Sequence, residues 1–309
     1  MPLSVLILCI SCVFSSTIAT AETDNAATSA CTVIRPSVEH PGNVNCLHVV
    51  TATANDGYFS KQEQYFLALI DLALEKSRVP HQVHTITLAP HTETRSLNNL
   101  LKGTYDIYWL NTTSKLEQQL QPIRIPLFKG LIGWKLLLIR KDDEALFTNI
   151  DTLSQLQPYR VLHGYDWADT PLLISNGFKV ITSTEFRNIS RMLARRRGDI
   201  FPRSVIEIWG QLEAVKGLNL AVEKNLVLQF PAAYYFFVHP DNVRLHQAIE
   251  AGLEKSLQDG SFTRLFMSFY GQEIKAAELH TRKPILLDNP TLPSATPLHR
   301  KELWFGSSK

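Results

Sequence analysis

The sequence has little cysteine, no excess of one charge, and no long apolar run beyond its first residues. Four of the 309 residues are cysteine, and the formal net charge is +2. A charge so near zero argues neither for nor against an anionic partner. After the N-terminal segment no apolar run approaches the roughly 20 residues that a membrane-spanning helix needs. The apolar content of 45% is nevertheless enough to form a real core.

Common catalytic and metal-binding signatures are also missing from the sequence. It contains no G-x-S-x-G, no G-x-G-x-x-G, no P-loop and no H-E-x-x-H motif. His81 and His84 lie three apart on a predicted strand, so they point to opposite faces and make a poor metal pair. One face of a predicted helix carries three basic side chains, those of Arg187, Arg191 and Arg195. We interpret this face as exposed to solvent rather than as a nucleic-acid binding surface. We therefore expect no catalytic residues, no metal, no cofactor and no nucleic-acid partner.

The N-terminus has the pattern of a secretory signal. Leu3–Phe14 is apolar, and Ala19-Thr20-Ala21 is an A-x-A cleavage site, which predicts a signal peptide over residues 1–21 and a periplasmic protein. An uncleaved anchor is the alternative. Cys31 and Cys46 remain in the mature chain, and in an oxidising compartment they are predicted to form a disulfide, the alternative being two unpaired thiols.

Strand and helix patterns alternate along the first half of the mature chain. Cys46–Ala52 is a predicted strand, and a helix at 61–77 follows a capping box formed by Ser60 and Glu63. Strands at 82–88 and 105–110 flank a helix at 94–102, which gives a βαβαβ order and a parallel sheet. A second alternating unit follows the apolar stretch 123–141; its predicted elements are strands at 160–162, 178–181 and 199–201 and helices at 166–176, 185–197 and 204–216.

The most informative stretch is Tyr234–Gly271. An aromatic strand ends at His239-Pro240-Asp241-Asn242, helical spacing follows, and Asp259-Gly260 separates that helix from a second one. This order resembles the end of a type II periplasmic solute-binding protein of the amino-acid-binder type. The stretch 123–141 resembles the crossover between the two lobes of that family.

The resemblance implies an α/β fold with two lobes, each a mostly parallel sheet flanked by helices, joined by two crossover segments. The tail after about Gly271 is an addition to the usual family pattern. The resemblance predicts this division of the chain: 1–21 signal peptide, 22–45 N-terminal extension, 46–135 first part of lobe 1, 136–228 lobe 2, 229–283 return to lobe 1, and 284–309 C-terminal tail.

Two ligand-contacting positions depart from the amino-acid binders. Those proteins place an Arg that binds the ligand carboxylate after the third strand, where this chain has Asn111–Lys115 and no Arg. The nearest Arg that could replace it is Arg124. The alternative interpretation is that Arg124 is an exposed charge on the surface of a strand. They place an Asp for the ligand ammonium where this chain has Phe201 and Arg203. A cleft-facing Arg203 would favour a carboxylate or another anionic group; a solvated position in the first turn of a helix is the alternative.

Other candidate contacts follow from topology, because ligands of open α/β sheets bind outside the carboxyl ends of the strands. Tyr58 and Trp109 follow or end predicted strands of lobe 1. Asp166, Trp167 and Asp169 lie where the first helix of lobe 2 begins. Each of these residues also has a structural interpretation. Asp166 can be the N-cap of the helix, and Asp169 can interact favourably with the helix dipole. Trp167 can contribute to packing within the lobe.

The resemblance implies a monomeric periplasmic solute-binding or ligand-sensing protein rather than an enzyme. Its lobes would close on a small, anionic or amino-acid-like ligand by hinge motion. A membrane permease of an ABC-type transporter, or a membrane sensor, would read the closed form. Two alternatives stay open: a dehydratase-like enzyme on the same scaffold, and an interaction module that has lost its ligand.

Overall fold

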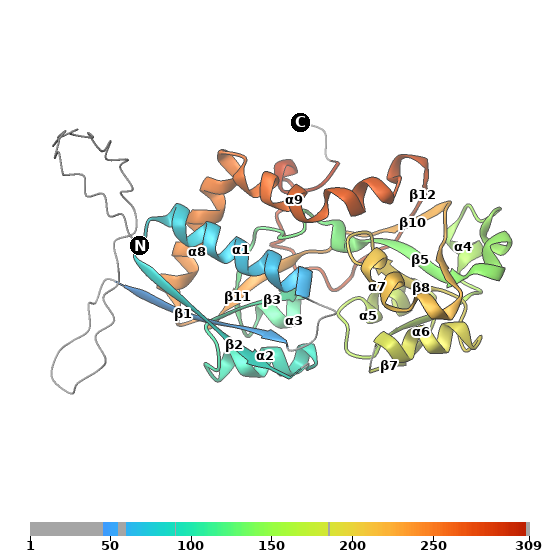
Figure 1. Cartoon of the computed structure of the whole chain (residues 1–309), viewed down its shortest axis with the longest axis horizontal. Helices are drawn as coiled ribbons and strands as arrows, with labels where there is room; N and C mark the ends of the chain where they lie inside the picture. Colours follow the sequence, from blue (N-terminus) through green and yellow to red (C-terminus); the bar gives the residue numbers. More distant parts are fainter. Residues whose placement is uncertain (1–45, 55–59, 90, 185, 307–309) are drawn as a thin grey trace, which may run out of the picture.

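The computed structural model describes residues 46–54, 60–89, 91–184 and 186–306. These residues form two α/β lobes side by side along the long axis of the molecule, with the first strands in one lobe and the middle of the chain in the other (Figure 1). The predicted fold class is confirmed. The predicted signal peptide lies outside the described residues.

Lobe 1 contains the start of the chain and a later return segment. Its helices α1, α8 and α9 pack together, and among the described helices α1 and α8 share the largest contact. Its elements are β1 (Leu47–Ala54), α1 (Ser60–Ser77), β2 (His81–Leu88), α2 (Glu93–Leu101), β3 (Ile107–Asn111), α3 (Ser114–Glu117), β4 (Gln121–Ile123), β11 (Tyr234–Val238), α8 (Val243–Gln258) and α9 (Ser261–Ala276).

Lobe 2 is built around the long strand β5, whose last six residues are buried. Its other elements surround this strand. They are η1 (Leu131–Gly133), β5 (Trp134–Arg140), η2 (Lys141–Phe147), α4 (Leu153–Leu156), β6 (Arg160–Gly164), α5 (Thr170–Ser175), β7 (Lys179–Ser183), α6 (Phe186–Ala194), β8 (Phe201–Ser204), α7 (Ile208–Ala214), η3 (Lys216–Leu218), β9 (Leu220–Val222), β10 (Leu226–Gln229) and β12 (Lys283–Leu286).

Strand pairing is more mixed than the sequence suggested. Pairs β1–β2, β6–β7 and β10–β12 are parallel. Pairs β3–β11, β11–β4, β5–β10, β5–β9 and β5–β8 are antiparallel. The strands that follow the return of the chain are antiparallel to earlier strands: β10 runs against β5, and β11 runs against β3 and β4.

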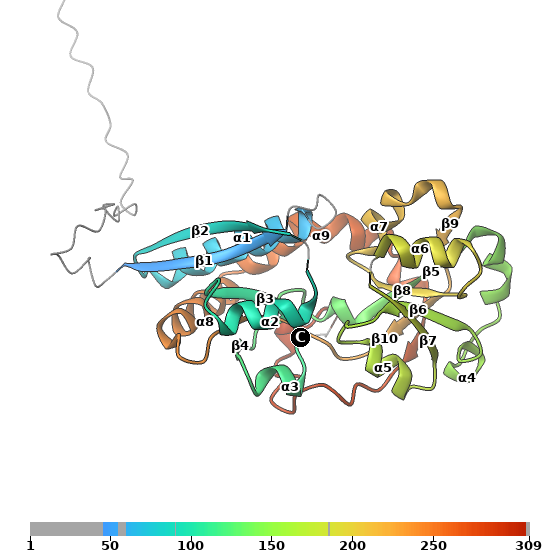
Figure 2. The same cartoon turned by 90° about the horizontal axis from the view of Figure 1, so that it is seen from below.

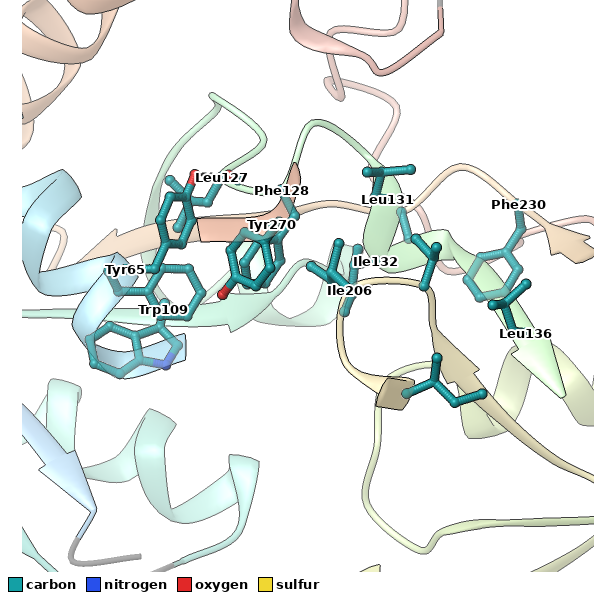
Figure 3. Close-up of a cluster of buried hydrophobic side chains, with 14 of the residues drawn as sticks. Tyr65, Trp109, Leu127, Phe128, Leu131, Ile132, Leu136, Ile206, Phe230 and Tyr270 are labelled. Carbon is teal, nitrogen blue, oxygen red and sulfur yellow. Dashed lines mark hydrogen bonds between the residues drawn. The ribbon is translucent and has the colours of Figure 1, made fainter. Parts of the chain in front are cut away.

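The two crossovers lie side by side and form the hinge. The Leu127 N–H donates to the Tyr234 carbonyl at 2.9 Å, and the Phe230 N–H donates to the Gly133 carbonyl at 3.1 Å. Figure 3 shows the apolar side chains here, with an aromatic group in lobe 1 and an aliphatic group that includes Leu136 at the start of lobe 2. The Tyr65 hydroxyl of the aromatic group donates to the Leu127 carbonyl at 2.6 Å. The hinge is thus continuous with the core of both lobes.

The last segment connects both lobes. Strand β12 extends the sheet of lobe 2, and the chain then runs back along the junction (Figure 2). The Ser114 N–H donates to the Thr291 carbonyl, and Arg300 pairs with Glu254 of α8. The Phe305 N–H donates to the Lys129 carbonyl at the hinge. Within the described ranges, no helix is long and apolar enough to cross a membrane.

Candidate functional site: a pocket between the lobes

A pocket of about 610 Å³ lies between the two lobes. Loops at the carboxyl ends of β1, β2 and β3 contribute from one side, and loops after β6 and β7 and the end of β8 contribute from the other. The lining residues of lobe 1 are Ala54, Gln62, Glu63, His91, Thr92, Glu93, Ser96, Tyr108, Trp109, Leu110, Asn111 and Tyr234. Those of lobe 2 and the hinge are Ile132, Lys135, Asp166, Trp167, Asp169, Thr184, Arg187, Arg203 and Glu207.

Five of the predicted contact residues line this pocket: Trp109, Asp166, Trp167, Asp169 and Arg203. They come from both lobes, as the rule on strand ends leads one to expect.

Two other predicted contacts do not line the pocket. Phe201 is on the same side of β8 as Arg203, but its side chain is fully buried behind Trp167, with ring centroids 6.1 Å apart. Arg124 is held by the Glu117 carboxylate through Nε and Nη2. Tyr58 and Cys31 lie outside the described residues. Cys46 is disulfide-bonded, and its pairing with Cys31 stays a prediction.

Lys135 and Asp169 form a buried ion pair at the floor of the pocket. The Nζ–Oδ2 distance is 2.7 Å, and each side chain is less than a tenth exposed. Asp169 is the residue just before α5, and Lys135 comes from β5 of the central sheet. Burial raises the pKa of Asp169, but Lys135 and the nearby Arg203 outweigh burial and hold that pKa below its ordinary value.

His163 stands behind this ion pair and is neutral. Its Nδ1 is 2.7 Å from the Thr170 hydroxyl, which itself donates to the Gly164 carbonyl at 2.5 Å. The hydroxyl therefore accepts from Nδ1–H. Burial lowers the pKa of His163 to about 4, against the opposing effect of Asp169. His163 thus orients the loop through a hydrogen bond and adds no charge at neutral pH.

Arg203 is buried, and the protein itself balances its charge. Nε donates to Gln211 Oε1 at 2.5 Å, Nη2 donates to Glu207 Oε2 at 3.0 Å, and the guanidinium lies 4.4 Å from the centre of the Trp167 ring. Arg203 lies on β8 opposite Leu136 of β5, rather than in the first turn of a helix. Among the described residues, the Nη1 group of Arg203 has no hydrogen-bond partner, whereas Nε and Nη2 are both bonded. Because Glu207 already balances the guanidinium charge, Arg203 would attract an anionic ligand only weakly.

Glu93 is the pocket residue that sequence reasoning missed. Thr92 caps α2 by accepting from the Arg95 N–H, which places Glu93 in the first turn facing lobe 2. The Glu93 N–H donates to Asp166 Oδ2 at 3.1 Å, a direct contact between the lobes. Burial, together with Asp169 and Asp166, raises the pKa of Glu93 to about 8. The rule on strand ends that marked Tyr58 and Trp109 would also have marked this loop, which follows β2.

Comparisons with known proteins establish the fold. No family model and no curated protein sequence matches the chain. Among solved structures, an ancestral arginine-binding protein bound to arginine is similar at TM-score 0.53 and 16% identity, over 74% of this chain and 99% of that one. The VFT2 domain of BvgS from Bordetella pertussis is similar at TM-score 0.56 and 17% identity, over 73% and 94%.

A histidine kinase sensor domain, described as similar to periplasmic binding proteins, matches at TM-score 0.55 and 14% identity, over 74% of this chain and 97% of that one. Binding proteins and sensor domains therefore share this architecture. The chain has the two-lobed fold of type II periplasmic binding proteins, as its sequence motifs suggested.

Proposed function

We propose that this protein binds a small solute in the pocket between its lobes and signals the bound state by lobe closure. The observation that carries the proposal is the pocket itself, with polar and aromatic side chains from both lobes and a direct Glu93–Asp166 contact across it. A solute that touches both lobes stabilises the closed form relative to the open one, which is a population shift.

The hinge supports this mechanism. Two adjacent crossovers connect lobes that otherwise have separate sheets. Closure by rotation about such short segments is a common response of two-lobed binding folds. The similarity to a histidine kinase sensor domain favours ligand sensing, with a membrane sensor as partner, alongside delivery to a permease.

The site of action in this proposal is the periplasm. It rests on the apolar segment and A-x-A site of residues 1–21. Expression of the full chain should yield a periplasmic product whose N-terminus is Glu22. A cytosolic product that retains Met1 would refute the localisation.

The direct test is a thermal-shift screen of the purified protein against single metabolites. A true ligand should raise the midpoint of unfolding in a saturable way, since ligand at one hundred times its Kd adds about 2.7 kcal/mol to the free energy of unfolding. Chemical conversion of the same compound would instead indicate a dehydratase-like enzyme. Failure of every compound to bind would contradict the proposal.

A further inference from the structure

The pocket contains more acidic than basic side chains. Its lining has five carboxylates, of Glu63, Glu93, Asp166, Asp169 and Glu207, and three basic groups, of Lys135, Arg187 and Arg203. Two of the basic groups are already neutralised, because Lys135 pairs with Asp169 and Arg203 pairs with Glu207. The third, Arg187, is exposed at the start of α6.

Glu93 and Asp166 bring two carboxylates together from opposite lobes. The hydrogen bond from the Glu93 N–H to Asp166 Oδ2 holds Asp166 against the start of α2. In the described part of the chain, no group donates a hydrogen bond to the Glu93 carboxylate or forms an ion pair with it. Two neighbouring carboxylates with restricted access to water repel each other unless a cation joins them or a proton neutralises one of them.

A second, independent observation points to a hydrogen-bond donor as the occupant. His91 lines the same pocket, and its Nδ1 lies 2.8 Å from the Ala89 carbonyl. That contact requires a proton on Nδ1, so neutral His91 presents Nε2 as an acceptor. Nε2 is buried and finds no partner among the residues that the structure describes. A ligand N–H would satisfy it.

The walls beside these acceptors are aromatic. Tyr108, Trp109 and Tyr234 line the lobe-1 side, with the Tyr108 and Trp109 rings 4.4 Å apart. Aromatic faces attract a cation through their quadrupole. In lobe 2, Arg203 already lies over the ring of Trp167.

We propose that the solute carries a positively charged nitrogen, an ammonium or guanidinium group, that bridges the carboxylates of Glu93 and Asp166. This inference rests on the proposed solute-binding function and names the chemistry of the ligand. A cation that binds one carboxylate from each lobe draws the lobes together. The group by which the solute is recognised is therefore also the group that stabilises the closed form. Burial is the main cause of the raised pKa of Glu93, with Asp169 and Asp166 adding to it and Lys135 opposing it, and a bound cation would lower that pKa.

The test is calorimetric titration of the whole purified protein with probes of defined charge. The cationic probes are L-arginine, L-lysine and putrescine; the uncharged and anionic probes are glycerol, acetamide and succinate. We expect saturable binding of at least one cationic probe and none of succinate. Glu93→Gln, which keeps the shape of the side chain, should weaken that binding at least tenfold, and Asp166→Asn should do the same.

The matched control is Glu213→Gln, since Glu213 is an exposed carboxylate on α7 that pairs with Lys216 outside the pocket. This variant should leave the affinity unchanged. Equal affinity of Glu93→Gln and the unaltered protein for the cationic probe would overturn the inference. So would tight binding of succinate without any cationic probe, although solute binding would then stand. Absence of binding by every probe would overturn both the inference and the proposed function.

Discussion

Lys135 has a position that lysine seldom occupies in a protein, because it lies inside a sheet with only 4% of its side chain exposed. Such a charge is tolerated because Asp169 Oδ2 is 2.7 Å away. The pair also orders the loop before α5, and that loop carries Asp166 and Trp167 to the pocket. The identity of one buried lysine thus determines the position of several pocket residues.

Replacement of Lys135 by methionine should destabilise the protein strongly. The Asp169 carboxylate would remain buried without its partner, a situation that costs about 3–5 kcal/mol. Chemical denaturation measures the change in the free energy of unfolding. The double variant Lys135→Met/Asp169→Leu should recover most of the loss, because it removes both charges. A single variant that loses less than about 1 kcal/mol would contradict this account.

Glu93 should make stability depend on pH. Its ordinary pKa is 4.5, and in the folded protein it is raised to about 8 by burial and by Asp169 and Asp166. Glu207 adds to this shift, whereas Lys135 opposes it. Between these two values the folded state binds more protons than the unfolded state, so its stability falls as pH rises. Below pH 4.5 the folded protein has the full stability that corresponds to protonated Glu93. This contribution decreases as the pH rises and is lost above pH 8.

The Glu93→Gln variant measures this effect, since it cannot ionise. The unfolding free energy of the unaltered protein minus that of the variant should decrease from pH 5 to pH 9, by on the order of 1–3 kcal/mol after screening in this half-buried site. The other pocket groups are common to both proteins and cancel in the difference. His91, which also faces the pocket, is retained in both. A difference that stays constant across this range would refute the raised pKa.

Among the described helices, α1 and α8 make the most extensive contact with each other. A Cβ placed on Gly252 of α8 would lie 1.8 Å from the Ala73 carbonyl oxygen of α1, a distance that no real contact allows. Only glycine permits this approach, and the helices bury Leu69, Ala73 and Leu253 between them and the rest of lobe 1. The spacing of the two helices therefore depends on one residue.

Gly252→Ala should consequently separate these helices and lower the free energy of unfolding by about 1–3 kcal/mol, as overpacking does. Gly210→Ala is the control, because a Cβ at Gly210 of α7 has open space around it. That change should leave stability equal or raise it by up to about 1 kcal/mol through higher helix propensity. Thermal or chemical unfolding of both variants provides the comparison. Equal effects of the two changes would contradict the packing argument.

Helix α5 shows how tertiary contacts change the start of an element. The sequence predicted a helix from Asp166, with that residue as N-cap, but α5 begins at Thr170. Trp167 instead packs against Arg203, and Asp166 reaches the start of α2 in the other lobe. Pro171 then suits the first turn of the helix, where a missing N–H has no cost. Neither partner is near in sequence, so local pattern could not locate this boundary.

At the scale of the whole molecule, the final segment links the lobes. It continues from β12 in lobe 2 to Arg300, which pairs with Glu254 in lobe 1, and ends at the hinge. Trp304 lies so close to the hinge that a Cβ on Gly130 would be 2.4 Å from its ring. None of the described residues after Tyr234 lines the pocket. We therefore interpret the segment as structural rather than ligand-binding.

Trp304→Ala should lower the free energy of unfolding by about 2–4 kcal/mol, because it leaves a gap against the hinge. Solute affinity should change less than tenfold, since the pocket lining is intact. Trp304→Phe, which keeps a ring in place, should cost less than half as much. Chemical denaturation and calorimetric titration of the two variants measure these effects. A large loss of affinity without loss of stability would contradict the structural role.

The sequence by itself determined the class of fold, because hydrophobic periodicity and turn residues are local signals. The strand, turn and two helices of Tyr234–Gly271 match β11, α8 and α9 closely. Topology then located part of the pocket, since the loops after parallel strands meet at one edge. Trp109, Asp166, Trp167, Asp169 and Arg203 are the pocket residues that this reasoning reached.

Only the tertiary structure decided the charge of the pocket. Lys135 and Asp169 lie far apart in the sequence, so their pairing cannot be read from it. Arg203 and Glu207 are close in the sequence, but Arg203 lies on β8 and not on a helix shared with Glu207, so helical spacing does not account for their pairing. These pairings decide which charge remains. Arg203 taken alone indicated an anionic ligand, whereas its contact with Glu207 leaves Glu93 as the unmatched group. Electrostatic energy depends on distances between side chains, and folding alone sets those distances.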